Sequence, residues 1–333
     1  MTCVKVDITD KELLSQWERL LQSSPMSSWF QTIEAYDFFL SIPDLLKPFG
    51  FALYDTKNRL KGVLIGFIII DKNSIRHFFS RRAIINGGPL LAEDITSEEI
   101  SKLLQTTITN LAKSVIYVEI RNFSDFNQWK SVFESTAFSY KPHYDIHIDC
   151  HSDFKISDSK LRQIRKSLHN GVEIATATSL AEIDDFYQIL NHLYRTKIHT
   201  PLFPLQFFHE FFLQKKGVFL LVKYNAKIIG GAMCPILTDK VIYEWFIAGN
   251  DKEYKALYPS VIATWAIMDY ANKNHIPLLD LMGAGVPDKP YGVRNFKLDF
   301  GGTLKEYGRF LHINNKVLFL LGKFAVKCLK REF

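Results

Sequence analysis

The sequence lacks the short signals that identify several common classes of protein. Its 333 residues contain four scattered cysteines with no C-x-x-C pair, and its ten histidines show no spacing typical of a metal site. There is no phosphate-binding loop of the G-x-x-x-x-G-K-[ST] type and no G-x-S-x-G nucleophile elbow. These absences argue against a disulfide framework, a zinc site, a P-loop enzyme and a serine hydrolase.

Signals for export and for membrane insertion are also missing. No apolar run reaches the roughly 18 residues that a spanning helix needs. The first residues include Asp7, Asp10 and Glu12 and show neither the basic nor the apolar region of a signal peptide. We therefore expect a cytoplasmic protein with reduced, mostly buried cysteines. The formal charge of +6 suits a phosphate-bearing partner but does not require one.

The two halves of the chain carry a similar segment. FALYDTKNRLKGV, which begins at Phe51, is matched by FLLVKYNAKIIGG from Phe219, and each copy reads as strand, polar turn and strand. Matched glycines at a constant offset favour an internal duplication. We expect the boundary in the polar stretch after Cys150, which gives domains of residues 1–150 and 151–333. The matched residues are Phe51 with Phe219, Leu53 with Leu221, and Gly62 with Gly230.

Residues 241–302 are predicted to organise the second half. A strand-like run from Val241 to Ala248 leads into a polar loop, and Pro259 then opens a helix that ends near Lys273. Leu278 to Met282 is a second buried strand, followed by a basic, aromatic loop. Strand, helix and strand form a βαβ unit, and ligands in open α/β sheets bind at the carboxyl ends of the strands.

Three residues near these strand ends are candidates for acyl-transfer chemistry. Lys297 lies between Phe296 and a glycine-rich turn, where an ammonium can hold an anionic group or stabilise an oxyanion. Transfer to an amine needs a base, and either Glu244 on the first strand or Asp280 on the second can serve. For Asp280 we favour a hydrogen-bonding role toward the following loop. Tyr243 either lines the same groove or belongs to the core.

Other cations are grouped along the second half. Lys289, Tyr291 and Arg294 share the loop before Lys297, where they suit an anionic ligand. Arg195 and Lys197 follow a predicted helix. A further helix places three cations on one face, and phosphate binding uses such groups, although a solvated face has the same appearance. These three are Arg162, Arg165 and Lys166.

The order of several motifs resembles the FemABX family. The motifs are the helix start at Pro259-Ser260, Leu278-Leu279-Asp280 followed by Gly283, and Phe296-Lys297-x-x-Phe300-Gly301-Gly302. Near the start, Phe30, Gln31, Thr32 and Tyr36 stand in the places of the family's F-x-Q-[ST]-x-x-W segment. The resemblance implies an α/β (α+β) protein of two tandem GNAT-like acyltransferase domains, each a mixed sheet flanked by helices. No long heptad segment is present, so the chain resembles the compact members without a coiled-coil arm.

The resemblance also implies a reaction. Members of the family transfer an amino acid from aminoacyl-tRNA to an amine of a peptidoglycan precursor and use no metal or nucleotide cofactor. It places Lys297 in the transfer site, with Glu244 or a substrate group as base and Arg195, Lys197 and Arg294 as contacts for phosphates or carboxylates. Some relatives carry a phosphate-contacting lysine where this chain has residues 38–40, Phe-Phe-Leu. That departure argues against a nucleotide-linked acceptor.

The loop before the central helix bears on the acyl donor. Acetyl-CoA-dependent GNAT enzymes cradle pyrophosphate with backbone N–H groups of a glycine-rich turn at a helix N-terminus. Residues 252–260 contain no glycine, and Pro259 has no N–H, which argues against CoA; Ser260 remains a candidate substrate contact. Two alternatives stay open: an acyl-CoA-dependent N-acyltransferase acting on an amino sugar of envelope polysaccharide, and a non-catalytic component of polysaccharide assembly.

The sequence ends in a predicted basic amphipathic helix from Lys316 to Arg331. Five residues form its expected apolar side, and lysines oppose them. Such a helix can lie on an anionic membrane, which would suit a lipid-linked precursor at the inner face. We favour the alternative, in which the helix packs against the second domain. The five apolar residues are Leu318, Leu321, Phe324, Ala325 and Leu329.

Overall fold

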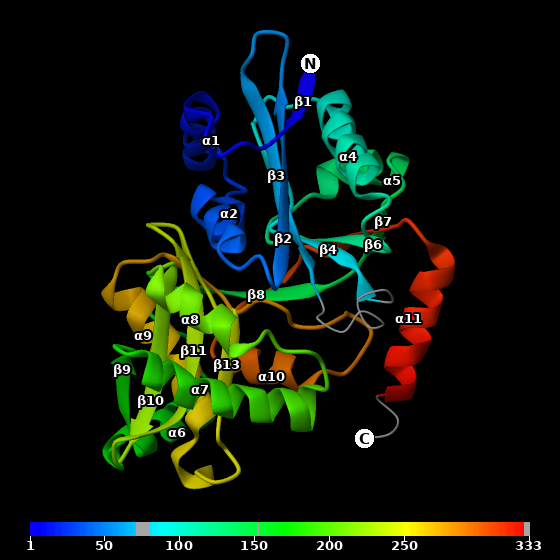
Figure 1. Ribbon diagram of the computed structural model, residues 1–333. Helices are drawn as coiled ribbons and strands as arrows, with labels where there is room; N and C mark the ends of the chain where they lie inside the picture. The colour runs from blue at the N-terminus through cyan, green and yellow to red at the C-terminus, as the bar shows by residue number, and fades with distance from the viewer. Residues whose placement is uncertain (71–79, 152, 330–333) are drawn as a thin grey trace. The chain divides into compact units, whose positions relative to one another are not determined.

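The chain forms two compact units, each built around its own sheet. The structure is a computed structural model that describes residues 1–70, 80–151 and 153–329, with the backbone alone for 325–329 (Figure 1). Unit 1 joins residues 1–143 to the segment from Glu306 onward, and unit 2 is Tyr144–Lys305. Each unit contains an eight-stranded mixed sheet. The α/β class expected from the sequence is confirmed.

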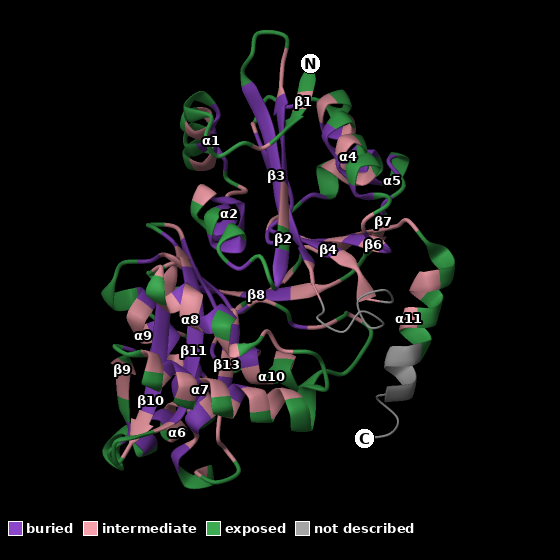
Figure 2. Ribbon diagram, viewed as in Figure 1, coloured by how far each residue is buried: buried purple, intermediate pink, exposed green. Residues whose placement is uncertain are grey.

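Helices cover both faces of the sheet in unit 1 (Figure 1). Alternate residues of the central hairpin, which is buried along most of its length (Figure 2), face opposite helix layers. Ala52 packs toward α1 and Leu53 toward α4. The strand order is β1 (Thr2–Lys5), β2 (Leu46–Tyr54), β3 (Leu60–Ile69), β4 (Arg82–Asn86), β6 (Tyr117–Arg121), β16 (Arg309–Ile313), β7 (Ser139–Lys141), with β5 (Leu90–Leu91) paired to β3. The helices are α1 (Lys11–Ser23), η1 (Trp29–Gln31), α2 (Ile33–Leu40), α4 (Ser97–Leu111), η2 (Asn127–Trp129), α5 (Lys130–Ser135) and α11 (Lys316–Leu329).

Unit 2 repeats this architecture. Helices α6 and α9 pack on one face of its sheet, and α7 and α8 cover the other with a cluster of aromatic rings. The strand order is β15 (Thr303–Glu306), β8 (Tyr144–Asp149), β14 (Leu278–Asp280), β12 (Val241–Tyr243), β11 (Lys227–Leu237), β10 (Gly217–Tyr224), β9 (Glu173–Thr176), with β13 (Phe246–Gly249) paired to β11. The helices are α6 (Asp158–His169), α7 (Leu180–Leu193), η3 (Tyr194–Ile198), α8 (Leu205–Leu213), η4 (Lys255–Leu257), α9 (Pro259–Lys273) and α10 (Gly292–Leu298).

The predicted internal repeat corresponds to a real structural repeat. In both units a hairpin is followed by a divided strand, a helix and a strand that runs parallel to the first part of the divided strand. Gly62 pairs with Leu53, and Gly230 with Val222, each as the last pair before a bulge. The glycines are therefore equivalent, as predicted. On the first strand, Leu53 is equivalent to Val222 and not to the predicted Leu221. The turn of unit 2 is shorter, because the strands already pair at Tyr224.

The units do not divide at the expected boundary. A boundary after Cys150 places β8 in the first domain, but β8 hydrogen-bonds to β14 and belongs to unit 2. β16 hydrogen-bonds to β6 and returns the chain to unit 1. The C-terminal helix α11 follows it there, where the ring of Phe319 contacts Tyr117, so its expected packing on the second domain is wrong. A strand's own sequence shows its periodicity but not its partner, which explains the difference.

Local sequence signals explain where several helices begin. α1 begins after Asp10, whose carboxylate caps it, and α9 spans the predicted residues. Between η1 and α2 the chain turns at Thr32, whose side chain caps α2, and Thr96 caps α4. The loop before Gly301 contains α10. Among the described side chains there is no disulfide, and Cys328 lies beyond them.

The F-x-Q segment and the Gly-Gly-Pro turn of unit 1 bind each other. The buried Gln31 amide donates to the carbonyl oxygens of Gly87 (3.1 Å) and Gly88 (3.0 Å), and it accepts from Ser28 N (2.7 Å). Trp17 donates to the Gln31 carbonyl. Both glycines have positive φ, and a side chain at Gly87 would overlap Ser28. This motif is therefore a structural clasp.

We predict that Gln31→Ala lowers the free energy of unfolding by about 2–4 kcal/mol, because it leaves several buried polar groups without partners. Urea titration measures the change. Gln105→Ala is the matched control, since the Gln105 amide is exposed and donates to Ser101; we expect a change within about 0.5 kcal/mol. Equal effects of the two substitutions would contradict the structural role of Gln31.

Candidate functional site

The parallel strands β12 and β14 end side by side in unit 2. Tyr243 pairs with Asp280 at their carboxyl ends, and Glu244 N donates to the Asp280 carbonyl (2.9 Å). β11 pairs with β12 on one side of Glu244 and with β13 on the other, so Glu244 and Trp245 form a bulge. The single strand predicted over 241–248 is thus divided at the predicted base. Bulges re-aim side chains, and this one turns Glu244 toward α10.

A buried ion pair occupies this end of the sheet. Lys297, in the last turn of α10, places Nζ 3.1 Å from Glu244 Oε1, and the two residues are 7% and 5% exposed. The ammonium also donates to the carbonyl oxygen of Leu281 and lies 3.5 Å from that of Met282. Glu244 Oε2 accepts no hydrogen bond from the described residues. The loop expected around Lys297 is a short helix, and its position depends on these contacts.

The environment makes Glu244 a stronger base than an ordinary carboxylate. Burial raises its pKa, the Lys297 cation opposes the rise, and the nearby Asp280 carboxylate reinforces it. A carboxylate with a raised pKa accepts a proton more readily from an amine. The pair therefore combines a proton acceptor and a cation at the place where ligands of α/β sheets bind.

Asp280 closes the strand end. Its Oδ1 accepts from Met282 N (2.6 Å), and its Oδ2 lies 3.5 Å from His147 Nε2 of β8. Met282 adopts a left-handed conformation with φ of 54°, which turns the chain sharply after the strand. Sequence reasoning missed His147, because only the pairing of β8 with β14 brings it beside Asp280.

Arg294 supports the loop after β14. Its guanidinium donates to the carbonyl oxygens of Ala284 (2.8 Å) and Val286 and stacks on the ring of Tyr144 at 4.9 Å. Tyr291 is exposed, and its ring lies so close to Gly285 that a side chain at Gly285 would overlap it. Burial and the proximity of Tyr291 raise the pKa of Tyr194 to about 12.

The remaining predicted residues lie on β12 and η3. Arg195 and Lys197 are exposed on η3, which begins at Tyr194. Tyr243 is buried on β12. The structure therefore brings Lys297, Glu244 and Asp280 together, with Tyr243 adjacent in the chain, and leaves the η3 cations at the surface.

The start of α9 is occupied by a carboxylate of the chain itself. Asp251 accepts from Ser260 N (3.0 Å) at Oδ1 and from the Ser260 hydroxyl at Oδ2. Gly249 packs so closely on Ser260 that a side chain there would overlap it. The helix N-terminus, which favours anions, is thus already neutralised. Sequence reasoning missed Asp251, because nothing local distinguishes it from other loop acids.

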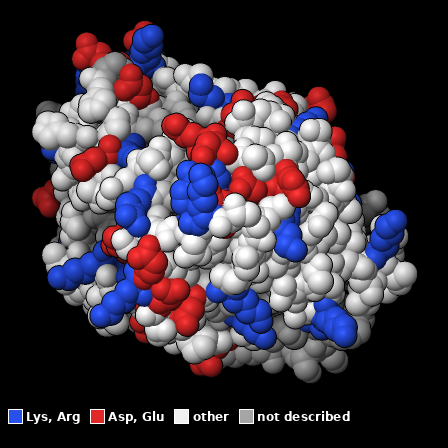
Figure 3. Space-filling model, turned by 90° about the horizontal axis from the view of Figure 1, so that it is seen from above, with Lys and Arg blue, Asp and Glu red and all other residues white. Residues whose placement is uncertain are grey.

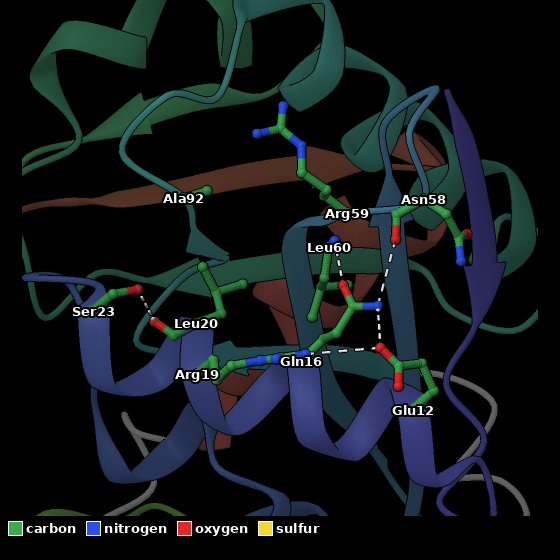
Figure 4. Close-up of a pocket in the computed structure, with 9 residues that line it drawn as sticks. All are labelled: Glu12, Gln16, Arg19, Leu20, Ser23, Asn58, Arg59, Leu60 and Ala92. Carbon is green, nitrogen blue, oxygen red and sulfur yellow. Dashed lines mark hydrogen bonds and ion pairs between the residues drawn. The ribbon is translucent and has the colours of Figure 1, made fainter.

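The pocket shown in Figure 4 lies in unit 1, between α1 and the β2–β3 turn. Its polar groups bind one another: Gln16 donates to Glu12 and to the Asn58 carbonyl and accepts from Leu60 N. It contains none of the predicted site residues, so we do not assign it the reaction. It is lined by Glu12, Gln16, Arg19, Leu20, Ser23, Asn58, Arg59, Leu60 and Ala92.

Two other kinds of site are not found in the described part of the chain. No group of His, Cys, Asp and Glu side chains there has the arrangement of a metal site. No helix of the described residues is long and apolar enough to span a membrane. On the molecular face shown in Figure 3, basic and acidic side chains alternate rather than form a field of one sign.

The fold is that of tandem GNAT-like proteins. The FemX crystal structure has a TM-score of 0.69 at 13% identity, covering 96% of this chain and 99% of that one. L-PGS from Bacillus licheniformis has a TM-score of 0.59 at 12% identity, with 96% and 97% covered. A tandem GNAT protein from the clavulanic acid biosynthesis pathway has a TM-score of 0.59 at 8% identity, with 94% and 98% covered. At these identities the likeness establishes the fold.

Residues 222–327, which include the whole ion-pair site, match the FemAB family model. No curated protein matches the chain in sequence. The FemAB match covers part of the chain, agrees with the motif resemblance to the FemABX family, and supports an acyl- or aminoacyltransferase as the class of enzyme.

The raised pKa of Glu244 predicts a specific pH dependence of stability. Between the ordinary value of 4.5 and the raised value, the folded state holds a proton that the unfolded state has lost. The free energy of unfolding contributed by Glu244 therefore falls as pH rises through this window. We expect wild type to lose stability relative to Glu244→Gln in urea titrations as pH rises above 4.5, the ordinary pKa of a glutamate.

Glu182→Gln is the control of opposite sign. Hydrogen bonds from Lys223 and Thr178 lower the pKa of Glu182 to about 2, so wild type should gain stability relative to that variant as pH rises toward 4.5. A wild-type-minus-Glu244→Gln difference that stays constant with pH would show that Glu244 titrates normally.

Proposed function

We propose that the chain transfers an aminoacyl group from aminoacyl-tRNA to an amine of a cell-wall precursor. The observation that carries the proposal is the buried Lys297–Glu244 pair at the ends of β12 and β14. The family and the shared fold support aminoacyl transfer as the reaction class.

The pair accounts for the proton movements of such a transfer. Glu244 accepts a proton from the ammonium of the acceptor, and the free amine attacks the ester carbonyl carbon of the donor. A C–N bond forms, the ester C–O bond breaks, and a second proton from nitrogen goes to the leaving ribose oxygen. The products are an amide, a free ribose hydroxyl and one released proton. Lys297 stabilises the intermediate oxyanion by exchanging its long contact with the Met282 carbonyl for that oxygen.

The start of α9 supports an RNA donor over CoA. CoA-dependent enzymes of this fold hold pyrophosphate at the equivalent helix N-terminus. Here the Asp251 carboxylate takes both hydrogen bonds of Ser260, and Pro259 offers no N–H. A pyrophosphate would have to displace a bound carboxylate and would be repelled by it.

The cations around the site are assigned to substrate groups. Arg195 and Lys197 on η3 are exposed and would contact phosphates of a substrate. Arg294 and Tyr291 shape the loop beside the pair, and Arg294 would orient a carboxylate only by giving up a carbonyl contact. Ser260 serves the helix cap instead.

We predict that Lys297→Ala lowers kcat for transfer from aminoacyl-tRNA by about 10²–10³-fold, the usual effect of removing one oxyanion donor. Lys273→Ala is the control, because Lys273 is exposed on α9 and pairs with Asp269; it should keep wild-type kcat. Single-turnover transfer of a labelled amino acid measures both.

A second variant separates chemistry from folding. Removing Lys297 alone leaves a buried carboxylate without its counter-ion, which lowers the free energy of unfolding by roughly 3–5 kcal/mol. Glu244→Gln/Lys297→Met leaves neither charge, so it should be more stable than Lys297→Ala and still inactive. Transfer by this double variant would refute the proposed mechanism. Saturable CoA binding by wild type would refute the proposed donor.

We further propose that α11 contacts an anionic membrane surface, which would suit a lipid-linked acceptor. Its exposed face carries four large apolar residues that are 49–68% exposed, and Lys316 and Lys323 flank them. Leu318, expected on the apolar side from the sequence, is half-buried instead. Apolar residues beside cations are typical of helices that lie in the membrane interface. The four residues are Val317, Leu320, Leu321 and Phe324.

We predict that Leu320→Ser/Phe324→Ser reduces co-sedimentation with phosphatidylglycerol vesicles at least fivefold, since it removes two exposed apolar anchors. Val4→Ser is the control, because Val4 is an exposed apolar residue of β1 outside this face. Equal binding of wild type to neutral vesicles, or no reduction in the double variant, would refute the membrane contact.

A further inference from the structure

Helix α6 of unit 2 presents a cationic face that the proposed chemistry does not use. Arg162, Arg165, Lys166 and His169 are all exposed. At 100° per residue these positions fall within one narrow face of the helix, while Ile164 and Ser167 turn inward. The three fixed cations thus form a stripe over little more than one turn, and His169 lies one turn farther along the same face.

The loop before α9 extends this stripe. The Ser167 hydroxyl donates to the Leu257 carbonyl (2.6 Å), which fixes η4 against α6, and Lys166 lies over the ring of Tyr258 at 5.7 Å. The same loop exposes Lys252 and Lys255. Together, the three cations of α6 and the two of the loop are called the α6 cation surface.

The cations of this surface have no acidic partners among the described residues. Neither the three on α6 nor the two on the loop form an ion pair there, whereas Lys160 on the same helix pairs with Asp299. Glu253, the acid within the loop, accepts from Asn250 (2.7 Å). Unpaired cations close together repel one another, and an anionic ligand relieves that repulsion.

The surface is connected to the ion-pair site. Lys160, in the first turn of α6, lies over the Phe296 ring at 4.4 Å, and Phe296 precedes Lys297 on α10. The stripe therefore runs away from the transfer site along α6, which is about 18 Å long. A substrate whose reactive end lies at Lys297 could follow it with a chain of phosphates.

We propose that the α6 cation surface binds the phosphate backbone of the base-paired end of the RNA donor. This inference rests on the proposed function. Paired RNA is recognised mainly through its backbone and shape, which suits arginines and lysines on a helix. A membrane is the other polyanion to consider, but the cationic face carries no large apolar residue to insert; Leu168 projects from another side of α6.

The test uses the full chain and a synthetic RNA hairpin with a single-stranded CCA end. Arg162→Ala/Arg165→Ala/Lys166→Ala should bind this hairpin at least tenfold more weakly at 0.15 M salt. The slope of log K against log salt should fall by about 2 to 3, one unit for each phosphate that the variant no longer neutralises. The control triple Lys47→Ala/Lys57→Ala/Lys113→Ala removes the same charge from exposed positions of unit 1 and should leave affinity and slope unchanged.

Turnover distinguishes the surface from the reaction. With the aminoacylated hairpin, the α6 triple variant should show a raised KM and an unchanged kcat. With an aminoacylated CCA trinucleotide, which has no paired stem, its kinetics should equal those of wild type. Equal hairpin affinity and slope in wild type and the α6 triple variant would overturn the inference while leaving the reaction intact.

Two further outcomes would also overturn it. If the α6 triple variant no longer bound phosphatidylglycerol vesicles but kept its affinity for the hairpin, the surface would be a membrane contact. If wild type used neither RNA donor while an acyl-CoA supported transfer, the proposed function itself would fail.

Discussion

The second unit depends on keeping two opposite charges buried against each other. A buried carboxylate or ammonium is costly alone, and the cost is offset only when geometry and additional hydrogen bonds are good. Glu244 reaches Lys297 because a bulge divides the strand, and Lys297 reaches Glu244 because α10 forms after the loop. The Leu281 carbonyl then accepts from the ammonium. The bulge, the left-handed turn at Met282 and the short helix are thus parts of one arrangement.

The sequence predicted the elements with strong local signals. A proline at the first helical position and a cation in the last turn located α9. The gathering of Lys297, Glu244 and Asp280 also followed from the rule that ligands bind at strand ends. What failed depended on distant partners. α10 begins at a glycine, and its Lys297 contacts a strand end far back in the sequence, so periodicity could not reveal it.

The two units solve the same structural problem with different chemistry. In each unit one strand is interrupted and forms two short strands, β4 and β5 in unit 1 and β12 and β13 in unit 2. The hydrogen bonding of the sheet is broken between the two parts. In unit 1 the neutral Gln31 amide fills the gap by donating to Gly87 and Gly88. In unit 2 the corresponding break carries Glu244 and its cation. An amide whose hydrogen bonds are all made cannot act as an acid or a base, whereas a carboxylate with a raised pKa can accept a proton. This difference explains why the acyl-transfer chemistry is assigned to unit 2.

The two regions of unit 2 that could bind phosphate, the start of α9 and the outside of α6, also differ in whether the chain itself occupies them. A small cofactor offers one pyrophosphate, and a single helix N-terminus can hold it. In this chain Asp251 fills that position at α9, so the cations that remain are spread along the outside of α6 and the adjoining loop. Cations spread over a surface gain little from one compact anion, because such an anion contacts only a few of them at once. They gain most from a ligand that carries a charge at every step of its backbone. The closed helix end and the open cationic stripe therefore favour the same extended, polyanionic donor.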